Sequence, residues 1–106
     1  MTPDDLDALG ALLRAGAPAT SADAYRSLPA ILAEGDDTPA AIEARIDLAL
    51  LSAREGLMES ALYQVDELTK DARRVSDLGH SPLIVERADA ARDAIEAAAS
   101  RATPLR

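Results

Sequence analysis

Residues 42–78 read IEARIDLALLSAREGLMESALYQVDELTKDARRVSDL, and this stretch decides the fold. After Gly56, apolar residues recur every three or four positions, which predicts one buried stripe along a helix of roughly 33 Å. The stripe consists of Met58, Ala61, Val65, Leu68, Ala72 and Val75. Before Gly56, apolar residues occupy more than half of the helical circumference, so we expect this first helix to be central. Gly56 is a natural helix stop, and the two halves form an antiparallel hairpin.

Outward from this hairpin, pairs of hydroxyl residues and prolines mark further helix starts. They are Thr2-Pro3, Thr20-Ser21, Thr38-Pro39 and Ser81-Pro82. We therefore predict a single all-α domain over residues 1–106, with five antiparallel helices arranged as a bundle or as a short repeat array. The predicted helices span about residues 3–16, 21–34, 39–55, 57–78 and 82–101, followed by a frayed tail at 103–106.

Each outer helix carries an apolar stripe of its own. The stripes are Leu6, Leu9, Leu12 and Leu13 in the first helix, Ala24, Leu28, Ile31 and Leu32 in the second, and Ile84, Ala88, Ala91, Ile95 and Ala98 in the last. Pro29 falls inside the second helix, so we expect a kink or a division near Ser27.

The composition is alanine-rich, without Phe, Trp or Cys and with only two Tyr. Helices built from such residues approach one another closely, and no segment alternates as a strand does. The absence of cysteine excludes disulfides and thiolate chemistry. No apolar run approaches the length that spans a membrane, and the N-terminus carries acids where a secretory signal places bases. We expect a soluble, cytoplasmic protein.

The net charge is −8, and residues 1–56 contribute −6 of it (10 acids, 4 bases). The negative electrostatic potential of such a chain disfavours contact with nucleic acid and with anionic lipid, and it favours a basic protein partner. Arginine accounts for all but one of the 11 basic residues, which is typical of a GC-rich genome, and we expect a bacterial source.

No residue pattern indicates catalysis. The one histidine, His80, lies between a helix stop and a helix start, without a second ligand at helical spacing. The acidic clusters at 4–7 and 34–37 lack the alternating pattern of a calcium loop. Ser81 is adjacent to His80 in sequence, so the pair cannot form a nucleophile–base geometry. We expect no metal, no cofactor and no enzymatic activity.

Residues 42–78 resemble a tetratricopeptide-type helical hairpin. Small and apolar residues stand at that family's spacings, at Leu48-Ala49, Gly56, Ala61, Val65 and Leu68. No bulky aromatic opens the first helix, and no proline closes the second. A preceding hairpin at 6–34 fits the pattern loosely, with residues 83–100 as a cap. A plain alanine-rich bundle explains the same small residues.

The resemblance implies a scaffold that binds a peptide or helix on a concave surface formed by the first helix of each pair. The implied contacts are Arg45, Asp47, Leu48, Leu51, Ser52 and Glu55. Alternatively, Leu48 and Leu51 simply pack under the first two helices.

The sequence therefore favours a non-catalytic interaction or regulatory module that presents a helical surface to a protein partner. The alanine stripe at 84–98 packs within the chain or pairs with a second copy, in which case Leu83 and Val85 belong to a homodimer interface. Alternative functions are an acidic inhibitor or DNA mimic that binds a basic protein, and a small-ligand-sensing bundle. The scarcity of aromatics argues against the last.

Overall fold

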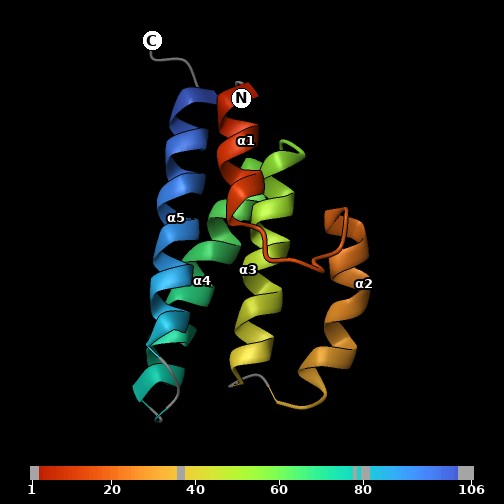
Figure 1. Cartoon of the computed structure of the whole chain (residues 1–106), viewed down its shortest axis with the longest axis vertical. Helices are drawn as coiled ribbons and strands as arrows, with labels where there is room; N and C mark the ends of the chain where they lie inside the picture. Colours follow the sequence, from red (N-terminus) through yellow and green to blue (C-terminus); the bar gives the residue numbers. More distant parts are fainter. Residues whose placement is uncertain (1–2, 36–37, 78, 80–81, 103–106) are drawn as a thin grey trace.

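The computed structural model describes residues 3–35, 38–77, 79 and 82–102. It confirms the all-α prediction: five helices form a bundle, and the described residues contain no strand (Figure 1). The helices are α1 (Pro3–Leu12), α2 (Ser21–Leu32), α3 (Pro39–Arg54), α4 (Met58–Asp77) and α5 (Leu83–Ala102). From α2 to α5 successive helices alternate in direction, whereas α1 and α2 both run downward in Figure 1, and α2 begins at about the level where α1 ends.

The capping residues act as the sequence predicts. Thr20 Oγ1 accepts a hydrogen bond from the Asp23 amide, and Thr38 Oγ1 accepts one from the Ala41 amide, each at 3.1 Å. At the end of α3, Gly56 has a φ of 85°, and the amides of Gly56 and Leu57 bond back to carbonyls of the last turn. This is a Schellman motif, which reverses the chain directly into α4.

The core is centred on α3, in which eleven of the sixteen residues are buried. Every predicted stripe residue of α4 is buried except Met58, which is half-buried. The whole predicted stripe of α5 is buried as well, so its alanines pack inside the chain against α3 and α4. Val85 packs on this core, whereas Leu83 is exposed.

One local prediction was wrong, and one of the two alternatives of another is excluded. The first helix ends at Leu12 and not near residue 16, because the Leu13 amide turns to the Gly10 carbonyl in a tighter bond. Leu6 of the predicted stripe is 39% exposed. The second helix is not divided by Pro29. Proline lies in its last turn, where it removes a single backbone hydrogen bond and the helix ends a few residues later.

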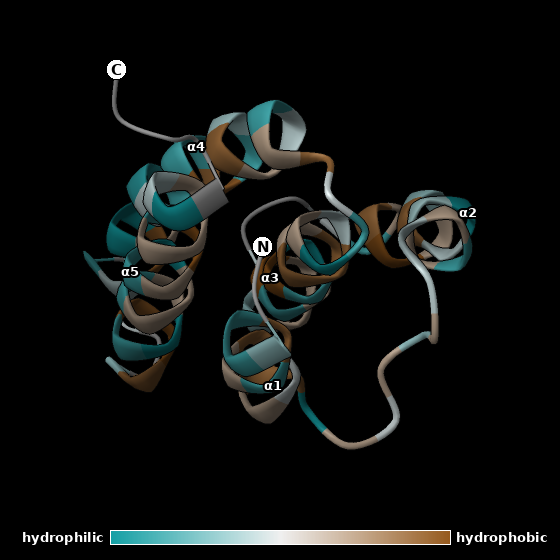
Figure 2. Ribbon diagram, turned by 90° about the horizontal axis from the view of Figure 1, so that it is seen from above, coloured by the Kyte–Doolittle hydropathy of each residue, from teal (hydrophilic) through white to brown (hydrophobic). Residues whose placement is uncertain are grey.

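The arrangement around α3 is asymmetric (Figure 2). α1 packs against α3 and α5, and α4 packs against both of them, so these four helices enclose the main core. α2 packs on α3 alone; none of its Cα atoms lies within 8 Å of α1 or of α4. The loose hairpin expected at 6–34 therefore does not form. His80, Ser81 and the tail at 103–106 lie outside the described residues.

Candidate functional site: the groove between α2 and α4

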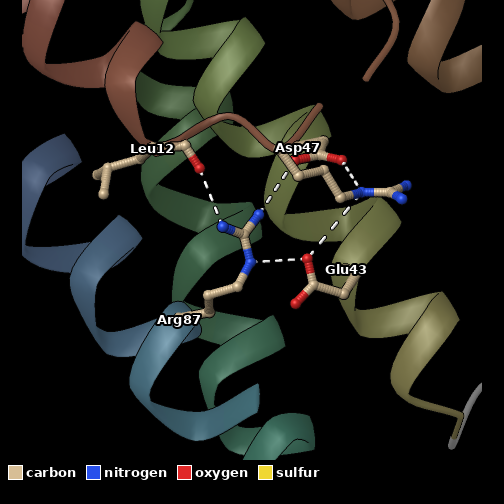
Figure 3. A network of polar contacts seen from close by, with 5 residues as sticks. Leu12, Glu43, Asp47 and Arg87 are labelled. Atoms are coloured by element: carbon tan, nitrogen blue, oxygen red, sulfur yellow. Dashed lines mark hydrogen bonds and ion pairs between the residues drawn. The ribbon is translucent and has the colours of Figure 1, made fainter. Parts of the chain in front are cut away.

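The densest cluster of charged side chains lies where α1, α3 and α5 meet (Figure 3). The Arg87 guanidinium donates to the Leu12 carbonyl at 3.0 Å, to Glu43 at 2.7 Å and to Asp47 at 3.3 Å. Arg14 donates to the second oxygen of Asp47 at 2.5 Å. Asp47 is 1% exposed, so both of its oxygens are committed to arginines inside the fold.

This cluster positions α1. Arg87 binds the last carbonyl of α1 and thereby satisfies a group that the helix itself leaves without a partner. A second buried carboxylate near the start of α1, Asp5, pairs with Arg101 of α5. The cluster is thus saturated by its own ion pairs, and Asp47 faces this flank of α3. It does not belong to the predicted contact surface.

The opposite flank of α3 is open. A hollow of about 460 Å³ and another of about 210 Å³ lie side by side between α2 and α4, and they share Tyr25, Leu48 and Gln64 in their lining. A third hollow of about 370 Å³ continues from Leu28 and Arg45. We call this continuous depression the α2–α4 groove; α3 forms its floor.

Large apolar side chains stand along this groove. Tyr25 on α2 is 68% exposed, Tyr63 on α4 is 71% exposed, and Leu57 before α4 is 51% exposed. Tyr25 and Tyr63 line the same 210 Å³ hollow from its two walls. Of the large hydrophobic residues that are exposed in the described part of the chain, only Leu6 and Leu83 lie elsewhere. The groove is therefore the main apolar surface of that part.

One end of the groove is fixed by a polar clamp between α2 and α3. Glu55 accepts hydrogen bonds from the Ser21 amide at 2.7 Å and from the Ser21 hydroxyl at 2.5 Å. These bonds, the hydroxyl's first, stabilise the carboxylate and lower the pKa of Glu55 below its ordinary value of 4.5. The clamp holds the N-terminus of α2 against the end of α3.

The predicted contact residues are divided between the groove and the packing beneath it. Leu48 and Ser52 line the larger hollow, and Arg45 lines the smaller one, where it donates to Asp71 at 2.7 Å. Leu51 is buried with Leu48 and Ala24 under α2. For Leu51 this agrees with the alternative that it packs beneath a helix of its own chain. Glu55 forms the clamp.

Sequence reasoning missed three exposed large hydrophobic residues of the groove and one half-buried residue that lines both main hollows. They are Tyr25, Leu57, Tyr63 and Gln64. The available signal was that both tyrosines fall outside the predicted apolar stripe of their own helix, and that the face of Tyr63 is otherwise polar. The Gln64 amide donates to Ser60 at 2.7 Å, while its Oε1 is enclosed without a partner among the described residues.

The described part of the chain contains no group of three or more metal-ligating side chains, and none of its helices is long and apolar enough to cross a membrane. Comparison with known proteins finds nothing similar: no family model, no curated protein and no solved structure matches this chain.

Proposed function

We propose that this protein is a non-catalytic interaction module and that the α2–α4 groove is its docking surface for a protein partner. The observation that carries the proposal is the placement of the only two aromatic residues of the chain. Tyr25 and Tyr63 stand exposed on facing walls of one hollow.

Tyrosine is enriched in protein interfaces because a rigid ring gives a large contact area while its hydroxyl stays hydrated. An exposed tyrosine on a monomer gains little from the fold itself. Together with Leu57, the two tyrosines form an apolar patch that is shielded from solvent only when another molecule covers it. The negative net charge adds long-range attraction for a basic partner.

The test is to block the groove without disturbing the core. Ser60 lines the larger hollow on the exposed side of α4, so Ser60→Trp fills the groove. Ala90→Trp, at an exposed position of α5, is the matched control. Both variants should keep the helical circular-dichroism spectrum. A photo-crosslinker at position 22, an exposed position of α2 that lines the same hollow, should then capture a partner from extract of the source cells with the control, and lose it with Ser60→Trp.

The captured partner must bind again when purified, with the same dependence on the two variants. Equal capture by both tryptophan variants would remove the groove from the docking surface. If partner affinity falls steeply as the salt concentration rises and is unchanged in Ser60→Trp, the acidic-inhibitor alternative is favoured. A concentration-dependent mass in light scattering, abolished by Ser60→Trp, would show that a second copy covers the groove.

A further inference from the structure

The length of the α2–α4 groove limits what fits along it. On α2 the lining runs from Ser21 to Leu32, about 17 Å at the rise of an α-helix, and on α4 from Ser60 to Arg74, about 21 Å. Resting on the docking function proposed above, we infer that the occupant is one amphipathic helix of a partner protein. It has about 12–14 residues and lies over α3 between the two walls.

Hydrogen bonding favours a helix over an extended segment. The serines of the lining are already engaged: Ser21 with Glu55, Ser52 with the Leu48 carbonyl, and Ser60 with Gln64. Arg45 is engaged with Asp71. Apart from the two tyrosine hydroxyls and the Glu67 carboxylate, the lining offers few groups to the many exposed amides and carbonyls of an extended chain. A helix satisfies these groups internally and presents only side chains.

The molecule already contains one helix seated in this manner. α1, ten residues long, lies in the angle between α3 and α5 and inserts the fully buried Leu9. The α2–α4 groove offers a second such angle on α3. A docked helix would complete a four-helix arrangement there with α2, α3 and α4.

The two main hollows specify the apolar face of the occupant. Along α4, their linings are centred about one helical turn apart, near Ser60 and near Tyr63. Two apolar side chains spaced three or four residues apart on a docked helix therefore fill both hollows. The 460 Å³ hollow takes the bulkier side chain, and the 210 Å³ hollow between the tyrosines takes a leucine-sized one.

The rim favours basic residues beside that face. Glu67 lines the smaller hollow, and its ion pair with Lys70 is long, at 3.7 Å. Glu59 is exposed and lines a neighbouring hollow that shares Leu57 and Ser60 with the groove. The basic residue at the α2 rim, Arg26, is paired with Asp23 of the same helix. Lysine or arginine on the flanks of the partner helix would meet these acids.

Two display libraries of peptides about 14 residues long, selected against the full chain, test this inference. The first fixes aliphatic residues at helical spacing (i, i+3, i+4, i+7) and varies the basic and neutral residues between them. The second has the same composition with two internal prolines, which prevent a continuous helix. Neither contains aromatics, so changes in tyrosine fluorescence report on Tyr25 and Tyr63 alone.

We expect binders from the first library whose helicity rises on binding. Affinity should fall roughly tenfold or more in the double variant Tyr25→Ser/Tyr63→Ser, and stay unchanged in Leu83→Ser, which alters an exposed leucine outside the groove. If only the proline library gives binders that the double tyrosine variant weakens, the inference of a helical occupant is wrong, whereas the proposed docking function is retained. The absence of groove-dependent binders from both libraries, with no crosslinked partner from extract, would overturn both proposals.

Discussion

The two flanks of α3 are built differently. On the α1 side, a helix lies in the angle between α3 and α5, held by the fully buried Leu9 and by a saturated network of buried carboxylates and arginines. On the α2 side, a helix of similar length packs on α3 alone and leaves the angle toward α4 open. Figure 2 shows both flanks in one view.

The difference distinguishes a flank that stabilises the fold from a flank that leaves a hollowed apolar surface in solvent. The α1 flank buries Leu9 completely and pairs its two buried carboxylates, Asp5 and Asp47, with arginines. The α2 flank buries a small cluster, Ala24, Leu48 and Leu51, and leaves its largest apolar side chains in solvent. Substitutions on the first flank should therefore change the free energy of unfolding, whereas those on the second should change binding.

The largest expected effect is from Leu9→Ala. Leu9 is completely buried, so its truncation leaves a cavity in the main core and should lower the free energy of unfolding by about 3 kcal/mol. Leu28→Ala, at a half-buried position on the α2 flank, should lower it by about 1 kcal/mol. Urea unfolding measures both. Equal losses would contradict the asymmetry.

Asp47→Asn should have the next largest effect. It removes the charge that Arg14 and Arg87 share, and it leaves two arginines facing a neutral amide. Both arginine side chains are partly exposed, at 43% and 31%, so their guanidinium groups can turn toward water. We therefore expect the free energy of unfolding to fall by about 2–3 kcal/mol.

The matched control for this variant is Asp89→Asn, which breaks a solvent-exposed pair with Arg73. In urea unfolding, the free energy of unfolding of the control should differ from that of wild type by less than about 0.5 kcal/mol. If Asp47→Asn were as mild as Asp89→Asn, the buried network would not be what fixes α1.

The fold was predictable because its determinants are local. The caps at Thr20 and Thr38, the stop at Gly56 and the stripes of α4 and α5 all depend on residues within a few positions of one another. Such signals give the number of helices and the buried face of each.

The relative placement of α1 and α2 was not predictable in the same way. It depends on contacts between distant residues, such as Arg87 with the Leu12 carbonyl, 75 positions apart. The groove was missed for the same reason. Leu48 and Ser52 were implied by the resemblance to a repeat hairpin, but Tyr25 and Tyr63 form one surface only because α2 stays away from α4.

The Ser21–Glu55 clamp predicts a smaller, pH-dependent effect on the α2 flank. Because the pKa of Glu55 is lowered in the folded protein, its contribution is complete above the ordinary value of 4.5 and disappears as pH falls through the lowered value. Wild type should therefore be more stable than Glu55→Gln at pH 7, and the difference should shrink on acidification below pH 4.5.

Urea unfolding across this pH range measures the difference. Ser21→Ala, which removes the hydroxyl donor and keeps the amide, should reduce the pH dependence partially. A difference between wild type and Glu55→Gln that stays constant from pH 7 to below the transition would show that the carboxylate is not held by the clamp.

The smallest effect on stability is expected from Tyr63→Ser. The ring is 71% exposed, so its removal exposes little that the fold had buried, and the free energy of unfolding should change by less than about 0.5 kcal/mol. Partner binding should fall in the same variant. A loss above about 1 kcal/mol would mean that the tyrosines close α2 onto α4 in solution, and the open flank would then be part of the core. A neutral stability result together with weaker partner binding would agree with the proposed docking role of Tyr63, whose ring the fold itself leaves in solvent.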